Sequence, residues 1–179
     1  MKATGIVRRI DDLGRVVIPK EIRRTMRIRE GDPLEIYTSR DGEVIFKKYS
    51  LMGGLDDFAA QLCETMSRST GAICAVTDRD SVIAVAGGAK RELLGKNLSP
   101  QLEQIMEQRN IYQYRSGQER LPVSESTGQY AAAVAAPILC GGDVLGLVLF
   151  VSAEDRLPGE GEYKLAQAVA GFLGKHMET

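Results

Sequence analysis

The chain has 179 residues and a formal net charge of −1, so it has room for one medium-sized domain or two small ones. Its longest apolar run, Val144–Val151, is too short to span a bilayer, and its first residues lack the pattern of a secretion signal. The three cysteines lie inside apolar stretches, as reduced thiols do, so the sequence predicts a cytoplasmic protein and disfavours a membrane-spanning or disulfide-linked one.

The charge is unevenly distributed along the chain. Residues 1–50 hold twelve of the 23 Lys and Arg residues and eight of the 24 Asp and Glu residues, which gives +4. Residues 51–179 hold the other eleven basic and sixteen acidic residues, which gives −5. A basic segment joined to an acidic one is typical of a protein that separates nucleic-acid binding from a second task, although an uneven solvated surface would give the same totals.

The first half of the basic segment predicts a hairpin and a short helix. Two β-branched runs, Gly5–Ile10 and Arg15–Ile18, predict strands joined by the connection Asp11–Gly14. Pro19 cannot continue a central strand but suits the first turn of a helix, which the spacing predicts over Lys20–Arg27.

A second hairpin completes the basic segment. Leu34–Ser39 and Glu43–Lys48 predict strands across the turn signal Asp41-Gly42. The resulting β-β-α-β-β unit is too small to bury much surface, and its strands carry apolar residues on both faces. We therefore expect two chains to exchange hairpins and to form an obligate dimer.

The rest of the chain predicts an α/β domain after a hinge at Gly53-Gly54. A helical period runs from Leu55 to Gly71, and Ser99-Pro100 is the start signature of a later helix. Residues 115–129 are polar and without period, which is typical of a functional lid or a mobile loop, and Pro137 predicts a bulge or a sheet edge. The other predicted elements are strands Ala72–Thr77 and Val82–Ala86, helix Gln101–Gln108, strands Ile111–Tyr114, Ala131–Leu139 and Val144–Val151, and helix Glu160–Met177.

Five arginines gather around the predicted junction between strand and helix: Arg8, Arg9, Arg15, Arg23 and Arg24. The segments Gly14–Arg24 and Gly31–Tyr37 resemble the DNA-binding domain of the AbrB family of bacterial transition-state regulators. This resemblance implies a homodimeric, swapped-hairpin β-barrel that binds double-stranded DNA at the positions of Arg8, Arg15, Arg23 and Arg24. A planar guanidinium group can bind phosphate or the edge of guanine with two hydrogen bonds, which supports the assignment.

The other basic residues of this segment are weaker candidates for DNA contact. Arg9 follows Arg8 on a predicted strand and would face away from it, while Lys2 and Lys20 suit phosphate contacts. Three further arginines are expected on the solvated surface: Arg27, Arg29 and Arg40. The alternative for the whole set is pairing with the neighbouring acids Asp11, Asp12, Glu21 and Glu30.

The acidic part of the chain resembles a GAF domain, a small-molecule sensor fold with a mainly antiparallel sheet. The multi-domain interpretation is an AbrB-type DNA-binding domain over residues 1–52 and a GAF-like sensor and oligomerisation domain over residues 53–179. The resemblance implies that residues 87–98 and 111–130 border a ligand pocket, although it identifies neither the effector nor the ligand-binding residues. The Asn-Lys-Phe-Asp-Glu signature of cyclic-nucleotide GAF domains is absent, so cAMP and cGMP are disfavoured.

The final predicted helix carries two apolar stripes, whereas a sheet can cover only one face of a helix. The first stripe contains Ala166, Val169, Ala170, Leu173 and Met177, and the second contains Leu165, Ala168 and Phe172. We expect the second stripe to join subunits, so that two dimers form a homotetramer. A single broad stripe that faces the core, without self-association, is the alternative.

Over its whole length the chain resembles regulators of spore-forming bacilli, which implies a nucleoid-associated transcriptional activator or repressor of late, forespore genes. We expect no catalytic residue, no cofactor and no metal site, since the single histidine, His176, lacks neighbouring ligands in the sequence. Two alternatives stay open. One is a GAF-fold methionine sulfoxide reductase with a nucleophile among Cys63, Cys74 and Cys140, and the other is an antitoxin, because toxin–antitoxin pairs use the same DNA-binding barrel.

Overall fold

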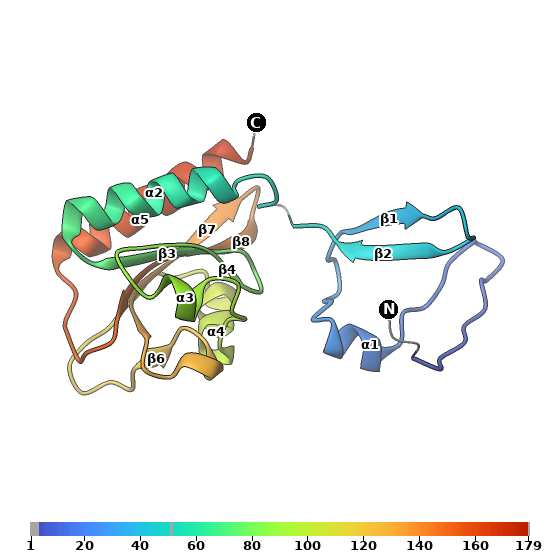
Figure 1. Cartoon of the computed structure of the whole chain (residues 1–179), viewed down its shortest axis with the longest axis horizontal. Helices are drawn as coiled ribbons and strands as arrows, with labels where there is room; N and C mark the ends of the chain where they lie inside the picture. Colours follow the sequence, from blue (N-terminus) through green and yellow to red (C-terminus); the bar gives the residue numbers. More distant parts are fainter. Residues whose placement is uncertain (1–3, 51, 179) are drawn as a thin grey trace. The chain divides into compact units, whose positions relative to one another are not determined.

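The computed structural model describes residues 4–50 and 52–178, and these divide into two compact units, Met1–Tyr49 and Ser50–Thr179 (Figure 1). We call them the N-terminal unit and the C-terminal unit and describe each by itself.

The N-terminal unit contains one short helix and one hairpin. Helix α1 spans Lys20–Thr25, and strands β1, Leu34–Thr38, and β2, Val44–Lys48, pair antiparallel. The turn between the strands places Gly42 at a φ of 81°, where a side chain would be strained. The predicted helix and second hairpin are therefore confirmed, with α1 ending two residues earlier than the apolar spacing suggests.

The predicted strands Gly5–Ile10 and Arg15–Ile18 are not formed within the single chain. Their connection does turn back, since the Asp11 amide donates to the Arg15 carbonyl at 3.0 Å, but the flanking residues have no ladder partners in the described chain. Val7 is 88% exposed and Val17 is 69% exposed. Pro19 is the one buried residue among residues 4–49, so this unit lacks a core of its own. Strands need a neighbour, and the sequence fits one supplied by a second chain.

The C-terminal unit is built on a six-stranded antiparallel sheet. Its strand order is β4-β3-β8-β7-β5, with β6 also paired to β7. The strands are β3 Ile73–Thr77, β4 Val82–Ala86, β5 Tyr112–Gln113, β6 Leu121–Pro122, β7 Ala131–Cys140 and β8 Asp143–Ser152. The helices are α2 Asp56–Thr70, α3 Lys90–Leu93, α4 Pro100–Gln108, a 3-10 turn Glu125–Thr127 and α5 Glu160–His176.

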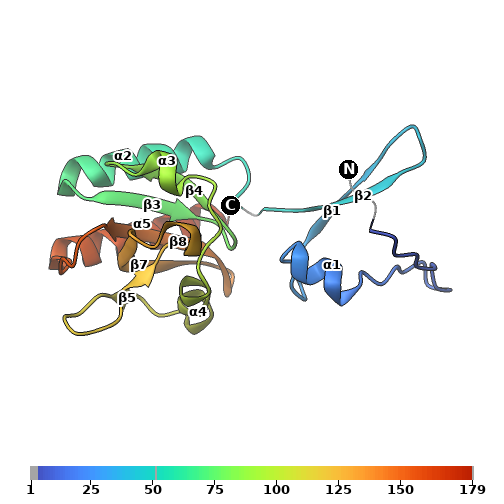
Figure 2. The ribbon, with the colours of Figure 1, turned by 60° about the horizontal axis from the view of Figure 1, so that its bottom comes forward.

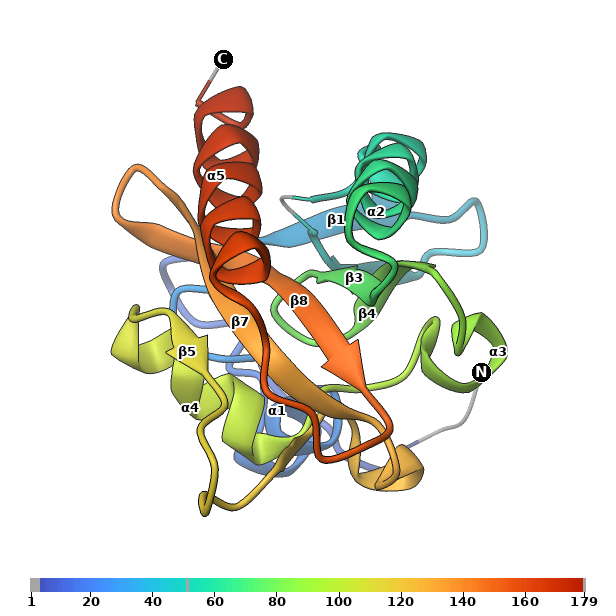
Figure 3. The same ribbon diagram turned by 90° about the vertical axis from the view of Figure 1, so that its left-hand side faces the viewer.

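Helices cover both faces of this sheet. Helices α2 and α5 lie on one face, and α3 and α4 lie on the other (Figure 3). In a second view the sheet strands lie between α2 and α4 (Figure 2). Two separate hydrophobic clusters result, one beneath α2 and α5 around Phe150 and one beneath α3 and α4 around Leu149. Gly174 lets α5 approach β7, because a Cβ at this position would overlap the Leu139 carbonyl oxygen.

The sequence predicts most of this unit correctly. Gly71, with a φ of 73°, ends α2, and the Ser99 hydroxyl accepts the Leu102 amide at the start of α4. A register shift between Ile138 and Leu139 follows Pro137, as the expected bulge requires. Three elements are too short for a detectable sequence period: the four-residue α3, the two-residue β6 and the 3-10 turn Glu125–Thr127.

The predicted lid is only partly irregular. Within residues 115–129, the strand β6 pairs with β7, and Val123 is fully buried. The Ser99 hydroxyl also donates to the Pro122 carbonyl at 2.6 Å, which ties this segment to the start of α4. Packing of a few apolar residues therefore fixes the second half of a segment that is polar overall.

Candidate nucleic-acid interface and sensor unit

The N-terminal unit presents its candidate DNA contacts in two groups. Arg8, Arg9 and Arg15 are exposed on the extended segment and its turn, and Lys20, Arg23 and Arg24 lie on α1. Arg23 is half-buried, and its Nε is enclosed without a hydrogen-bond partner among the described residues. Lys2 lies outside the residues that the structure describes. Within the single chain the described candidates therefore lie on two separate segments, the extended segment with its turn and helix α1.

The turn of the extended segment is organised by one carboxylate. Asp11 Oδ1 accepts the amides of Leu13 and Arg15 at 3.0 and 2.7 Å, and its Oδ2 accepts Arg15 Nε at 2.8 Å. The hydrogen bond from the Arg15 backbone amide is the largest cause that lowers the pKa of Asp11, and the hydrogen bond from the Arg15 side chain is the next largest. Pairing with an acid, the alternative to DNA contact, is therefore realised for Arg15. Its side chain remains 69% exposed, and such solvated ion pairs are weak.

The C-terminal unit contains a polar cluster that the sequence does not reveal. Tyr114 donates its OH to Asp155 Oδ1 at 2.6 Å, and Arg120 donates to the carbonyls of Ser152 and Ala153 at 2.6 and 3.2 Å. These bonds join the segment before β6 to the loop that leads from β8 to α5. The bonds span 32 to 41 residues of sequence, so no local pattern could have indicated them.

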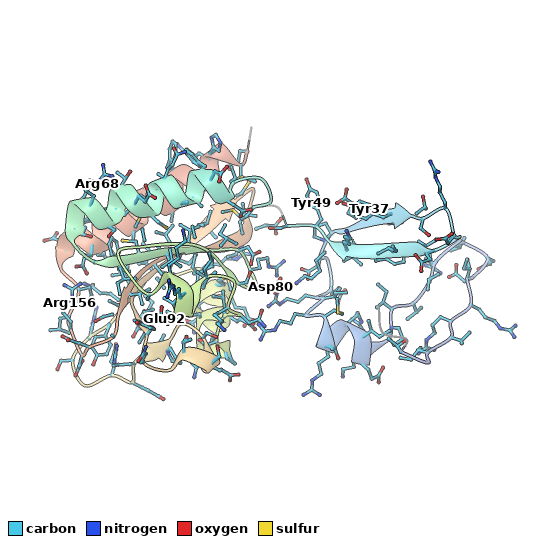
Figure 4. All side chains as sticks on the ribbon, in the orientation of Figure 1. Tyr37, Tyr49, Arg68, Asp80, Glu92 and Arg156 are labelled. Carbon is cyan, nitrogen blue, oxygen red and sulfur yellow. The ribbon has the colours of Figure 1, made fainter. Side chains whose placement is uncertain are left out.

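The same loop is tied to α5 by an ion pair. The Nη2 atom of Arg156, a residue labelled in Figure 4, lies 2.8 Å from Glu162 Oε1. Glu162 is the buried acid in the first turn of α5. The other oxygen, Oε2, is enclosed without a hydrogen-bond partner among the described residues. Segments 87–98 and 111–130, the expected borders of a ligand pocket, contribute Leu93, Leu98 and Val123 to the core beneath α3 and α4.

Two of the three cysteines are unsuited to nucleophilic chemistry. Cys63 and Cys74 are fully buried, whereas Cys140 is half-buried. Burial is the main cause that raises the pKa of both buried thiols to about 12. The neighbouring Cys74 raises the pKa of Cys63 further, and Glu162 raises that of Cys74 further. A thiol with that pKa is almost entirely protonated near pH 7, and the thiolate is the reactive form.

The outer surface of α2 and α5 carries an aromatic cluster. The ring centroids of Phe58 and Phe172 lie 6.0 Å apart, and His176 lies 5.1 Å from Phe58 and 6.1 Å from Phe172. Phe172, from the second predicted stripe, is 51% exposed, and Ala168 is also exposed. The first stripe faces the core, as expected, with Leu165 packed at its border.

Two kinds of feature are absent from the described residues, 4–50 and 52–178. No group of three or more His, Cys, Asp or Glu side chains gathers there as a metal site would require. Within the same residues, no helix has the length and hydrophobicity needed to cross a membrane.

Comparison with known proteins finds a matching family for each of the two parts of the chain. The family described as "Stage V sporulation protein T C-terminal, transcription factor" matches residues 54–178, and "Antidote-toxin recognition MazE, bacterial antitoxin" matches residues 7–51. The chain is 49% identical to stage V sporulation protein T of Bacillus subtilis (strain 168), with 99% of each chain covered. It is 63% identical over 49 residues to the transition state regulatory protein AbrB of the same organism, which covers 27% of this chain and 50% of AbrB.

A structural comparison concerns the C-terminal unit. The phycoerythrobilin-bound GAF domain of a cyanobacterial phytochrome matches with a TM-score of 0.51 and 18% identity, and covers 70% of this chain and 86% of that one. This likeness shows the GAF fold alone. The expected combination of an AbrB-type swapped-hairpin domain and a mainly antiparallel GAF-like domain is confirmed. With identity of 49% along nearly its whole length, the chain belongs to the stage V sporulation protein T family of sporulation transcription factors.

Proposed function

We propose that this protein regulates late, forespore transcription in the cytoplasm, at the nucleoid, by binding double-stranded DNA through residues 1–52 as a dimer. The observation that carries the proposal is the N-terminal unit itself, which contains the six described candidate cations and has no buried residue among residues 4–49 except Pro19. Such a unit gains a core by exchanging hairpins, and pairing doubles its cations along one duplex. Arg8, Arg15, Arg23 and Arg24 contact DNA, with Lys20 and Lys2 as additional phosphate contacts and Arg9 as a weaker candidate beside Arg8.

The exposed aromatic cluster on α2 and α5 supports self-association of residues 53–179 into a tetramer. Phe58, Phe172 and His176 come from two helices that cover one face of the sheet, so a second copy can pack against both helices at once. Exposed aromatic side chains of this kind are typical of protein interfaces. The tetramer would then be two dimers joined through their C-terminal units.

The segments 87–98 and 111–130 are our candidates for sensing a small-molecule effector. The supporting observation is their position over the second hydrophobic cluster, together with the bonds from Tyr114 and Arg120 to the loop before α5. A ligand that displaced these segments would act on the helix that carries Phe172.

The test is DNA binding by full-length variants. We expect Arg15→Ala and Arg23→Ala each to weaken binding to a promoter duplex by about tenfold or more while the protein still dimerises. Gel-shift titration measures the affinity, and sedimentation measures the dimer. Arg40→Ala, in the turn between β1 and β2, is the matched control. Unchanged affinity for both Arg15→Ala and Arg23→Ala would remove the proposal.

The antitoxin alternative receives support from the match to a MazE-type family over residues 7–51. Against it, residues 50–179 form a compact unit with two hydrophobic clusters, whereas antitoxins usually end in a disordered tail that wraps the toxin. Limited proteolysis separates the two cases, because a folded C-terminal unit resists cleavage and a disordered tail does not. Rapid loss of residues 55–179 would favour the antitoxin.

A further inference from the structure

Helix α1 carries Arg23 and Arg24 but has little to hold it in place by itself. It has six residues, no buried residue, and no side-chain hydrogen bond at its N-cap, Pro19. Isolated helices of this length are unstable in water, because the first turn fixes several residues for a single hydrogen bond. The direction of its two arginines must therefore be fixed by contacts outside the helix.

The chain reverses immediately after α1. The Ile28 amide donates to the Arg23 carbonyl at 2.8 Å, and the Arg27 amide donates to the Arg24 carbonyl at 3.3 Å. These two bonds form a Schellman closure around Arg27, which has a φ of 52°. Glycine is the usual residue at this position, because a side chain is strained in the left-handed region. The closure therefore engages the backbone of both arginines and places an arginine where glycine would fit better.

Lys48 holds this closure from strand β2. Its Nζ donates to the Arg27 carbonyl at 2.8 Å, across 21 residues of sequence, and its side chain is half-buried. An ammonium group is favourable at the carbonyl end of a helix. The neighbouring residue, Lys47, lies on the opposite face of the strand by alternation, and its Nζ is 4.6 Å from the ring centre of Tyr37 on β1. Tyr37 is labelled in Figure 4.

We propose that Lys48 is a positioning residue for DNA recognition. It holds the Arg27 reversal in place, and the reversal fixes the backbone from which Arg23 and Arg24 reach the duplex. The inference rests on the proposed function, because it takes those two arginines as DNA contacts. Lys48 itself acts through hydrogen bonds within its own unit and does not touch the nucleic acid.

The first test compares two neighbouring lysines in the full-length protein. A fluorescent duplex selected in vitro by the parent protein is titrated and followed by anisotropy. Lys48→Met should weaken binding by about tenfold, the range that a hydrogen bond to a charged group supports. Lys47→Met, which removes the same charge from the other face, should change the affinity by less than about twofold. Equal affinity of Lys48→Met and the parent would overturn the inference.

The second test separates positioning from direct phosphate contact. Glycine adopts the left-handed conformation without strain, so the closure should need Lys48 less once Arg27 is replaced by glycine. In the Arg27→Gly background, Lys48→Met should therefore cost less than about threefold in affinity, which is a coupled and non-additive effect. A direct phosphate contact predicts the same loss in both backgrounds, and this result would overturn the inference.

Two controls complete the design. Should the Lys48→Met variant fail to dimerise in sedimentation, adding Arg27→Gly must restore both the dimer and DNA binding. Failure of this rescue would assign Lys48 a general structural role and overturn the inference. Arg23→Ala and Arg15→Ala are measured alongside. If Arg23→Ala and Arg15→Ala both bind like the parent, the proposed function fails. If Arg23→Ala loses binding while Lys48→Met retains it, only the positioning role of Lys48 fails.

Discussion

The hydroxyl of Tyr114 and the carboxylate of Asp155 are joined by a 2.6 Å hydrogen bond, although 41 residues of sequence separate them. This bond to Asp155 is the main cause that raises the pKa of Tyr114. A raised tyrosine pKa means that the folded state favours the protonated hydroxyl, so the bond stabilises folding below about pH 10 and is lost as the pH rises through the raised pKa.

Tyr114→Phe should therefore lower the thermal unfolding midpoint at pH 8 by a few degrees, because the Asp155 carboxylate loses its donor. The difference between parent and variant should shrink as the pH approaches 11, since a tyrosinate would repel Asp155. Calorimetry across this pH range measures both midpoints. Tyr49→Phe, which alters an exposed tyrosine, is the control, and a difference that persists unchanged at pH 11 would contradict the assignment.

Asp11→Asn should strengthen binding to non-specific duplex DNA by about threefold at low salt, and the gain should fade as salt is raised. Asparagine can still accept the amides that Asp11 accepts, but it releases the Arg15 guanidinium and removes a negative charge. Anisotropy titrations at several salt concentrations provide the measurement. Asp12→Asn removes one neighbouring charge without releasing Arg15 and should give a smaller gain. Weaker binding by Asp11→Asn would mean instead that the ion pair orients Arg15 for DNA.

The salt dependence of operator binding should be steep. If six to eight phosphates are neutralised by the paired N-terminal units, the slope of log affinity against log salt should be roughly −5 to −7. Arg15→Ala should reduce the size of this slope by about two, one for each chain of the dimer. A slope near −2 for the parent would show that the arginines do not face the phosphate backbone.

Phe172→Glu should convert the proposed tetramer into a dimer. The substitution places a charge within the aromatic cluster of α2 and α5, where it would be desolvated on association. Light scattering after size exclusion should then report about 39 kDa in place of about 78 kDa, two and four times the 19.5 kDa chain. Gln167→Glu, exposed on the other side of the same helix, should leave the tetramer intact. A tetramer that survives Phe172→Glu would locate the contact elsewhere.

The cysteines should differ in reactivity. Cys63 and Cys74 are fully buried with pKa values of about 12, so they should resist a thiol reagent at pH 8 until the protein unfolds. Cys140, which is half-buried, should be labelled first. Mass spectrometry of tryptic peptides after timed labelling measures all three. Rapid labelling of Cys63 or Cys74 in the folded protein would revive the reductase alternative.

The sequence predicts elements well where a single chain supplies their partners. Helix α2, the hairpin β7–β8 and helix α5 are each long, strongly periodic and closed by turn residues such as Gly71. The strand predicted over Arg15–Ile18 is not formed in the single chain, for the opposite reason. Its composition favours a strand, but a strand needs a neighbour, and the single chain offers none.

The site is predictable only in part. The arginines that we propose as DNA contacts are suggested by the sequence, because their chemistry and spacing resemble those of a known DNA-binding family. The role proposed for Lys48 cannot be predicted from the sequence, because its hydrogen bond to the Arg27 carbonyl depends on where a hairpin places one side chain relative to a helix end. The Tyr114 and Arg120 bonds escape detection for the same reason, because they depend on tertiary packing and not on local pattern.

Because the N-terminal unit encloses only Pro19 among its described residues, the proposed pairing would tie its folding to dimer formation, and the amount of dimer formed from free chains would rise with the square of their concentration. A tether between subunits changes that dependence. If the C-terminal units hold chains together, the N-terminal units of those chains would meet at an effective concentration in the millimolar range, whatever the abundance of the protein in the cell. Whether a promoter is occupied would then depend less on how much protein a cell makes than on how firmly α2 and α5 keep the chains together.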